Sequence, residues 1–283
     1  MLTDEICISK LIRELKLTGK QVYSNCFFRF SNAGQEWELY NSAGSLLLVK
    51  QENGVLRLFF FTIDFSDLKQ LMEDSLASDR EYILEIVAKD KALYRNELLD
   101  MGFDVFAQML RMSVKDISPL FQNGSAFVEA YDEQLVEQAR PEDVPALLDK
   151  LWHIFDTRVS HLPDEEELKS AILRGEFCLC RGKDSDIPAF LQSVMEPRSF
   201  YINQVYNGGE KKLIHSIMHK RLAEYYQQGG RYVFAWVDER NQASLRFHEK
   251  YGLKPDGLWT SVYQRRRQEA DEGDKADGNE EVS

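Results

Sequence analysis

The stretch that decides the fold is WVDERNQASLRFHEKYGL, residues 236–253. It continues an apolar and aromatic run that begins at residue 232 and is typical of a β-strand. A helix is predicted over residues 242–251. Gly252 stands where this helix would end, because glycine adopts the left-handed conformation of helix C-termini at little cost. A further strand is expected near residues 258–264, so the stretch predicts a strand, a helix and a second strand.

The same order of elements occurs 150 residues earlier in the chain. Residues 82–112 align with residues 232–262 without a gap, and Gly102 then corresponds to Gly252. A period of this size is far longer than that of solenoid repeats and indicates a duplicated domain. Few letters are identical, so the alternative is that two unrelated strand–helix–strand units coincide.

The segments before each copy complete the prediction of a mixed α/β (α+β) sheet protein. In the first half, strands are expected over residues 45–51 and 55–63 around an Asn53-Gly54 turn, followed by a helix over residues 65–76. In the second half, helices are expected over residues 144–155, 164–173 and 212–228. Strands are expected there over residues 177–181, 187–195, 200–206 and 232–237.

Two domains and a tail follow from this reading. The N-terminal domain is predicted over residues 1–120 and the C-terminal domain over residues 126–267, with a linker at residues 118–125. Residues 268–283 hold seven acidic residues against one lysine and have no aromatic residue. Such a segment cannot bury enough apolar surface to offset its chain entropy, so a disordered acidic tail is expected.

In this order of elements the second half resembles the GNAT superfamily of acyl-CoA-dependent N-acyltransferases. Asn241 and Ser244 match the family's Asn-x-x-Ala/Ser pattern. FHEKYGL, residues 247–253, is similar to the signature phenylalanine, tyrosine or histidine, glutamate, lysine, x, glycine, phenylalanine. The resemblance covers residues 128–264, and by duplication the first half resembles a shortened, diverged GNAT-like domain. Tandem GNAT domains are a known architecture of that superfamily.

The resemblance implies acetyl-CoA as co-substrate. In the family two central parallel strands splay apart at a bulge, the pantetheine arm pairs with the first strand, and the pyrophosphate binds N–H groups where the next helix begins. Transferred to this sequence, the cofactor-binding residues are Gln204, Val205, Tyr206, Gly208, Gly209, Lys211, Lys212, Asn241 and Ser244.

The phosphate-binding turn departs from the family pattern. Glu210, Leu213 and His215 stand where the family has an arginine and two glycines. An acidic group about 5 Å from a phosphate charge costs about 3 kcal/mol at an effective dielectric near 20, so Glu210 must point away if the cofactor is to bind well. In the first half no glycine turn precedes the helix, and Asp64 would repel a phosphate. A cofactor site is therefore expected only in the second half.

His248 occupies the position where the family often has a tyrosine acid, so the resemblance implies that it is the general acid; the alternative is an ordinary packed histidine. The base is left open among Glu196, Asn203 acting through water, and His161. A backbone N–H near Val205 is the expected oxyanion donor. Asn241 and Ser244 have an equally ordinary role in capping the last helix.

The four cysteines do not form a metal-binding or disulfide pattern. Cys178 and Cys180 lie on one face of a strand, and no nearby histidine or cysteine adds two further ligands, so inert thiols and no metal are expected. An acidic N-terminus without an apolar core is unlike a secretory signal, which predicts a cytoplasmic protein.

Composition limits the partners. The chain has 283 residues and a formal net charge of −12, which disfavours binding to nucleic acid. The longest apolar run is too short to span a bilayer, so no membrane partner is expected. The leading hypothesis is an N-acetyltransferase that acts on an amine of a small molecule or peptide. Alternatives are a non-catalytic GNAT-fold binding or regulatory protein and, more distantly, a transferase that uses an aminoacyl-tRNA donor. The oligomeric state stays open.

Overall fold

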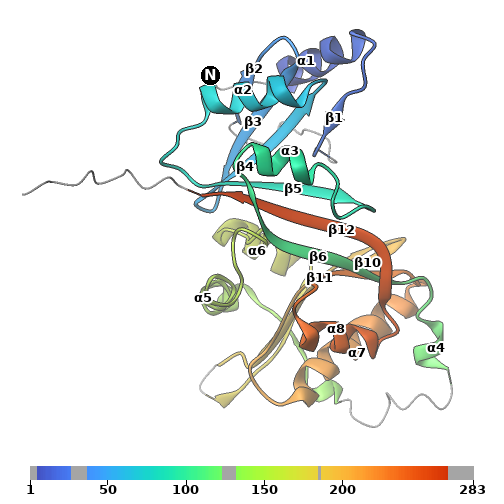
Figure 1. Cartoon of the computed structure of the whole chain (residues 1–283). Coiled ribbons are helices and arrows are strands. Elements are labelled where there is room, and N and C mark those ends of the chain that lie inside the picture. Colours follow the sequence, from blue (N-terminus) through green and yellow to red (C-terminus); the bar gives the residue numbers. More distant parts are fainter. Residues whose placement is uncertain (1–4, 27–36, 123–131, 184–185, 267–283) are drawn as a thin grey trace, which may run out of the picture.

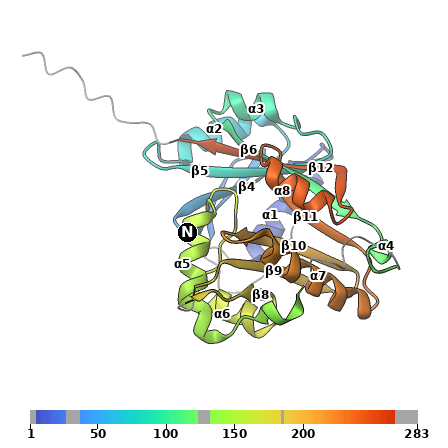
Figure 2. The ribbon, with the colours of Figure 1, turned by 90° about the horizontal axis from the view of Figure 1, so that it is seen from below.

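The computed structural model describes residues 5–26, 37–122, 132–183 and 186–266. In this part of the chain a single mixed sheet of 12 strands runs through the whole molecule, with helices on both faces (Figures 1 and 2). The mixed α/β class is therefore confirmed. The predicted tail, residues 268–283, lies outside the described residues, as does part of the predicted linker.

The described residues of the N-terminal unit form three helices and six strands. Its elements are α1 (Glu5–Leu17), β1 (Tyr23–Ser24), β2 (Trp37–Asn41), β3 (Ser45–Glu52), β4 (Val55–Thr62), α2 (Phe65–Ser75), β5 (Tyr82–Ala88), α3 (Arg95–Asp100) and β6 (Asp104–Val114). Asn53 and Gly54 have φ of 50° and 81°, and they form the predicted hairpin turn between β3 and β4.

The C-terminal unit begins with the short helix α4. Its elements are α4 (Ser118–Phe121), β7 (Glu137–Gln138), α5 (Val144–Ile154), α6 (Glu165–Leu173), β8 (Phe177–Cys180), β9 (Ala189–Glu196), β10 (Ser199–Asn207), α7 (Lys211–Gln227), β11 (Val233–Asp238), α8 (Gln242–Glu249) and β12 (Lys254–Arg265). Short 3₁₀ turns at Glu133–Leu135 and Pro141–Asp143 precede β7 and α5.

The two units exchange their last strands. The strand order is β2-β3-β4-β5-β12-β6-β11-β10-β9-β8-β7, so β12 lies between β5 and β6, and β6 lies between β12 and β11. Tyr82 lies opposite Arg265, and Val233 lies opposite Val114. Once the 150-residue offset is applied, these two pairings have the same antiparallel register. The sequence repeat is therefore a structural repeat, and each copy needs the other to complete its sheet.

The helix ends of the two copies also correspond. Gly102 and Gly252 have φ of 80° and 79°, each just after its helix. Phe103 N donates to Leu98 O, and Leu253 N donates to His248 O, the bond that closes a Schellman motif. This correspondence places His248 at the position of Leu98, which is fully buried in the first copy.

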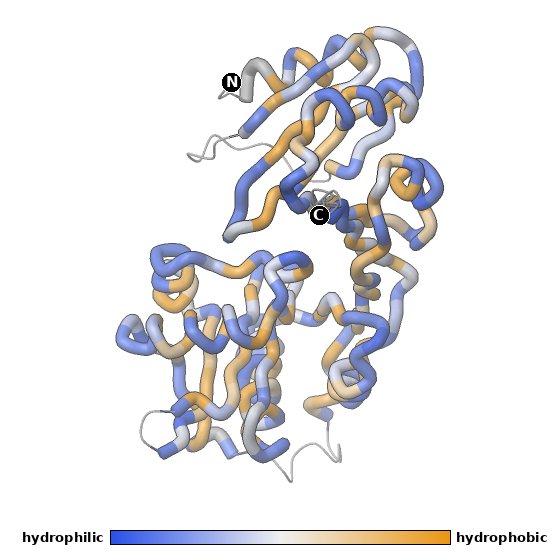
Figure 3. The backbone as a smooth tube through the Cα atoms, turned by 60° about the vertical axis from the view of Figure 1, so that its left-hand side comes forward, coloured by the Kyte–Doolittle hydropathy of each residue, from blue (hydrophilic) through white to orange (hydrophobic). Residues whose placement is uncertain are grey.

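Apolar clusters cover both faces of the sheet in each unit, and Figure 3 shows apolar residues concentrated along the strands. In the N-terminal unit α2 and α3 pack on one face, and α1 packs on the other. In the C-terminal unit α5 and α6 cover one face, and α7 covers the other. No helix in the described part of the chain is both long and apolar enough to cross a membrane.

Candidate active site

The centre of the C-terminal unit opens where β10 and β11 separate. These parallel strands pair only from Phe200–Val233 to Ile202–Ala235. On its other side β10 pairs with β9, and the register shifts between Ile202 and Gln204, so Asn203 is an extra, bulged residue. A bulge bends its strand and increases the local twist. The edge of β10 beyond Ile202 therefore faces a gap instead of a neighbouring strand.

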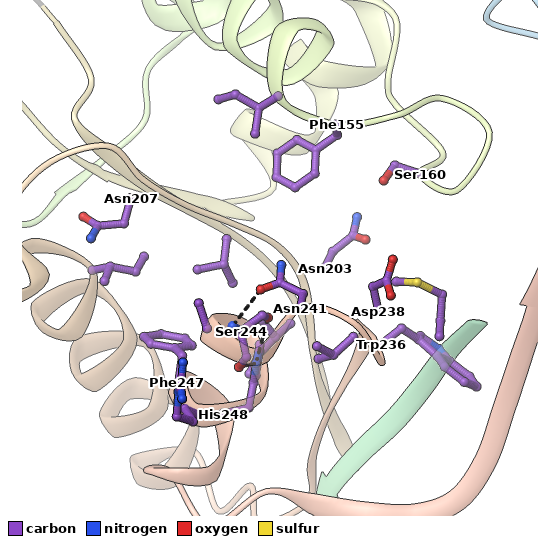
Figure 4. A pocket seen from close by; sticks show the side chains of 18 of the residues that line it. Phe155, Ser160, Asn203, Asn207, Trp236, Asp238, Asn241, Ser244, Phe247 and His248 are labelled. Carbon is purple, nitrogen blue, oxygen red and sulfur yellow. Dashed lines mark hydrogen bonds between the residues drawn. The ribbon is translucent and has the colours of Figure 1, made fainter. Parts of the chain in front are cut away.

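A cleft of about 760 Å³ occupies this gap. Its walls come from the loop between α5 and α6, from β10 and β11, from the first turn of α7 and from α8; Met109 of the N-terminal unit also reaches it. In Figure 4, Phe155 and Ser160 approach from the loop, opposite the side chains on β10, β11 and α8. Of the residues predicted from the sequence, Val205, Lys211, Asn241, Ser244 and His248 line the cleft.

The N-terminus of α7 faces one end of the cleft. Its N-cap, Glu210, makes no side-chain capping bond, and this exposed residue is outside the lining of the cleft. Lys211 lines the cleft, whereas Lys212 forms an ion pair with Asp132 at 3.3 Å. The first N–H groups of a 17-residue helix and one lysine thus supply positive potential there. Glu210, the acid expected to repel a phosphate, thus lies outside the lining of the cleft.

The two predicted phosphate-binding glycines lie in a tightly packed turn outside the lining of the cleft. Gly208 N donates to Pro188 O at 2.8 Å, so this N–H is unavailable to a phosphate. A Cβ atom on Gly208 would lie 2.1 Å from the hydroxyl oxygen of Tyr206, and one on Gly209 would lie 3.2 Å from Pro188 Cβ. These positions are glycine because the chain passes closely over Tyr206 and Pro188. Neither residue lines the cleft.

Three other predicted residues also lie away from the cleft. Gln204 is 3% exposed and is paired with Gln192 on β9. Tyr206 packs against Phe190, beneath α5. Glu196 is an exposed residue of the β9–β10 hairpin, where it accepts a hydrogen bond from Ser199, and this hairpin precedes the bulge at Asn203 in the middle of β10. Glu196 is therefore not placed to act as the base.

Asn241 and Ser244 begin α8 at the edge of the cleft. Ser244 N donates to Asn241 Oδ1 at 3.0 Å, which is an N-cap bond. The side-chain carbonyl of Asn241 is therefore used within the helix, and the capping role expected from the sequence is the one observed. The Asn241 amide group and the Ser244 side chain still contribute to the cleft lining.

His248 has no proton to donate into the cleft. Its Nδ1 lies 2.8 Å from the carbonyl oxygen of Ser244, which only accepts, so Nδ1 carries the proton. The buried Nε2 then has a bare lone pair and no hydrogen-bond partner in the described part of the chain. Burial lowers the pKa of His248 to about 4, although the bond to Ser244 partly opposes this. The predicted general acid is instead a neutral core histidine, as its correspondence with Leu98 indicates.

A second histidine, not considered from the sequence as a catalytic group, lines the cleft near the start of α7. His215 Nδ1 lies 2.8 Å from the hydroxyl group of the buried Tyr251, and the His215 ring packs against Phe247. Burial and the charges of Lys250 and Lys211 lower the pKa of His215, so it is neutral at pH 7. His215 is thus bonded to Tyr251 through Nδ1, and the Tyr251 hydroxyl also lies 3.5 Å from His215 O. No local motif signals this pair, because His215 lies on α7 and Tyr251 lies in the turn that follows α8.

The other side of the bulge carries a closed chain of polar groups. Tyr201 OH donates to Asn203 Oδ1 at 3.0 Å, and Asn203 Nδ2 donates to Gln192 Oε1 at 2.9 Å. Burial and the charge of Glu85 raise the pKa of Tyr201 to about 12. Asn203 lines the cleft, but its carboxamide is held in a fixed orientation. It can orient an acceptor or a water molecule, and it cannot itself take up a proton.

His161, the third candidate base, is a cation. It lies 2.8 Å from Glu52 and 3.3 Å from Glu85. Desolvation alone would lower the pKa of His161, but the hydrogen bonds to these carboxylates outweigh it and raise the pKa to about 9. A group already protonated at pH 7 is not a general base.

The N-terminal unit contains the equivalent splay, but it is closed. β4 and β5 pair only from Leu56–Tyr82 to Leu58–Leu84. Beyond this point β1 pairs with β4, and the side chain of Asn25 binds both Leu58 O (2.9 Å) and Phe60 N (2.8 Å). The strand edge that is open in β10 is thus occupied in β4. Asp64 caps α2 by accepting from Ser66 N.

In the described part of the chain, the thiols and carboxylates do not form a metal site. Burial raises the pKa of Cys178, and burial raises that of Cys180 to about 11. Cys178 Sγ contacts Gln138 Oε1 at 3.3 Å. Among the residues that the structure describes, no three histidine, cysteine or acidic side chains are grouped so that they could hold a metal ion. Both thiols are therefore core groups with little thiolate character at pH 7.

Comparison with known proteins identifies the fold. No protein-family model matches the sequence, and a search among curated proteins finds no significant match. Among solved structures, a tandem GNAT protein from the clavulanic acid biosynthesis pathway matches with a TM-score of 0.55 and 11% identity, covering 95% of this chain and 97% of that chain. GCN5-related N-acetyltransferases from Sphaerobacter thermophilus (TM-score 0.52, 13% identity, 80% and 81% covered) and Kribbella flavida (0.50, 14%, 94% and 96%) also match. The chain has a GNAT-like fold in tandem.

Proposed function

We propose that the protein is an N-acyltransferase that transfers an acetyl group from acetyl-CoA to an amine of a small molecule or peptide. The observation that carries the proposal is the contrast between the two splays. The copy in the C-terminal unit opens onto a cleft of about 760 Å³, whereas the copy in the N-terminal unit is closed by Asn25. A site kept open in one copy and filled in the other is expected when one copy binds the cofactor.

The residues around the cleft fit a CoA thioester. The unpaired edge of β10 beyond Ile202 offers backbone groups to the pantetheine arm, and Lys211 with the N-terminus of α7 suits the pyrophosphate. We propose that a backbone N–H near Val205 donates to the thioester carbonyl oxygen. When bound, acetyl-CoA supplies an activated acyl group whose leaving thiolate has a conjugate pKa near 8.5, so no strong protein acid is required.

The acceptor amine must be neutral to attack the thioester. Glu196 is remote, His161 is a cation and Asn203 is fixed, so none of the three candidate bases can accept its proton. We therefore propose that the amine loses its proton to water before attack, and that the Asn203 carboxamide orients it. The amine nitrogen then bonds to the acetyl carbon, and the C–S bond breaks so that CoA leaves as the thiolate beside the neutral His215. The proton that the nitrogen still carries passes to this thiolate or to water, which leaves a neutral amide.

The second candidate function is a GNAT-fold protein that binds an acyl-CoA without turnover. Two observations favour it: Nε2 of His248 carries no proton, and the two carboxylates that line the cleft, Asp156 and Asp238, are each bonded to an arginine, Arg158 and Arg240.

One assay separates these two functions. Purified protein is incubated with acetyl-CoA and a panel of polyamines, arylalkylamines, aminoglycosides and peptides, and release of free CoA thiol is followed. Thiol release that depends on an amine supports the transferase. Saturable acetyl-CoA binding with no thiol release across the panel supports the binding protein.

A further inference from the structure

The loop between α5 and α6, residues 155–163, forms one wall of the cleft. Phe155, Asp156, Val159 and Ser160 line the cleft from this loop. Val159 N and Ser160 N both donate to Asp156 O, so the loop contains its own turn. The loop contains no strand or helix. Its position therefore depends on the residues that contact the side of the loop facing away from the cleft.

That outer side is held by the N-terminal unit. Arg57 Nη2 donates to Thr157 O at 2.7 Å, and Asn53 Nδ2 donates to Leu162 O. His161 bridges Glu52 and Glu85. Apolar contacts follow the same boundary, since Val159 packs against a cluster of β4, β5, β6 and β12 side chains. The guanidinium of Arg158 lies 4.2 Å from the ring of Phe106.

Arg57 is the centre of this contact. Its side chain is 3% exposed, and it joins Thr157 O to Glu85 through Nη1 at 2.5 Å, with Nε 3.4 Å from Glu52. A buried guanidinium is costly unless its donors are bonded, so its presence fixes the positions of the groups that it binds. A loop bonded to such a group moves only if these bonds break.

We propose that Arg57 is a positioning residue for the acceptor side of the cleft, and that the N-terminal unit, which has lost its own open splay, holds the acceptor wall of the C-terminal unit. The inference rests on the proposed acyl transfer. It separates the roles of the two sides: the cofactor side is built by α7, α8 and β10 of the C-terminal unit, and the acceptor wall is held by Arg57, Glu52 and Glu85 of the N-terminal unit.

The charges at this contact make its strength depend on pH. The ionisable groups that face His161 or the carboxylates bound to it are Lys50, Glu52, Arg57, Glu85, Glu166, Glu167, Arg174, Glu176 and Tyr201. Below its raised pKa of about 9, His161 is a cation between Glu52 and Glu85. Above this pH the two carboxylates lose a cation that links them to the loop. The loop should therefore loosen in alkaline solution.

The test is hydrogen–deuterium exchange of the apo protein, read at the amides of Val159 and Ser160. Arg57→Met should speed their exchange about tenfold or more, since a tenfold change corresponds to about 1.4 kcal/mol. The Arg57→Met/Glu85→Gln double variant keeps the buried charges balanced and should show the same loosening if the single variant folds poorly. The control is Arg111→Met, which removes the Arg111–Asp256 pair at 2.7 Å, away from the loop.

Two further readouts separate positioning from general stability. The dissociation constant of acetyl-CoA should change less than about twofold in Arg57→Met, whereas the KM of any amine that is turned over should rise about tenfold with a smaller change in kcat. After correction for intrinsic exchange, wild-type loop protection should fall above pH 9, and His161→Gln should lack this step.

Unchanged protection of the loop in both Arg57 variants would overturn the inference, as would an equal loss of acetyl-CoA affinity. The exchange measurement needs neither ligand nor turnover, so it stands even if no amine in the panel is acetylated.

Discussion

Removing the side chain of Asn25 tests why only one unit keeps an open splay. Asn25 is 4% exposed, and it binds Leu58 O at 2.9 Å and Phe60 N at 2.8 Å. In Asn25→Ala both backbone groups lose their partner, and each buried unpaired group costs about 1–3 kcal/mol. We expect the free energy of unfolding to fall by about 2–4 kcal/mol in urea denaturation followed by circular dichroism. Acetyl-CoA affinity should be unchanged, because the cleft lies in the other unit.

The matched control is Asn96→Ala, an exposed position on α3. Alanine has the higher helix propensity, so this variant should be as stable as wild type or slightly more stable. A loss below about 1 kcal/mol in Asn25→Ala would refute the view that this side chain closes the N-terminal splay. So would a second acetyl-CoA site in the wild-type protein.

Lys211→Ala should weaken acetyl-CoA binding about fivefold in calorimetric titration, because an exposed charge contributes about 1 kcal/mol to binding. Lys212→Ala should leave the affinity unchanged, because the Lys212 ammonium is already paired with Asp132. The pKa of His248 is about 4 in the folded protein and about 6.5 in the unfolded chain, so between these pH values only the unfolded chain is protonated at this residue. The free energy of unfolding should therefore fall by up to about 3 kcal/mol as the pH drops from 6.5 to 4. His248→Leu should remove this loss in acid denaturation and leave kcat within about twofold. The transfer rate should rise with pH up to the pKa of the acceptor amine, and a plateau near pH 5 would instead reveal a carboxylate base. Scanning calorimetry should give one cooperative transition, because β6 and β12 are exchanged; two transitions would contradict a shared sheet.

The elements were largely predictable from the sequence, because their signals are local. The Asn53-Gly54 turn, the helix ended by Gly252 and the 150-residue repeat all correspond to observed geometry. Helix α1 and strands β1 and β2 were missed, since no motif drew attention to the first 41 residues. The strand exchange could not be predicted, because β6 and β12 have the same pattern and the pattern does not say which copy each strand joins.

The site was predictable only where the backbone defines it. Val205, Lys211, Asn241 and Ser244 line the cleft because their places follow from the order of strands and helices. The role of His248 did not follow, because its tautomer depends on a backbone carbonyl one turn away. The repeat did contain a usable signal, since it aligns His248 with the buried Leu98.

The contacts that hold the α5–α6 loop could not be predicted from the sequence. Its contacts join Arg57 to Thr157 and Glu52 to His161, about 100 residues apart along the chain, without a shared motif. Only the fold shows that the N-terminal hairpin meets the α5–α6 loop. The predicted domain boundaries and the cytoplasmic location stay predictions.

The most direct test of a single cofactor cleft is isothermal titration of the purified protein with acetyl-CoA. The account predicts one molecule bound per chain and a loss of affinity of at least about tenfold in Lys211→Glu, because the variant places a negative charge beside the phosphates. Asn25→Ala should bind as wild type does. No heat of binding at millimolar acetyl-CoA, or two molecules per chain, would contradict the account.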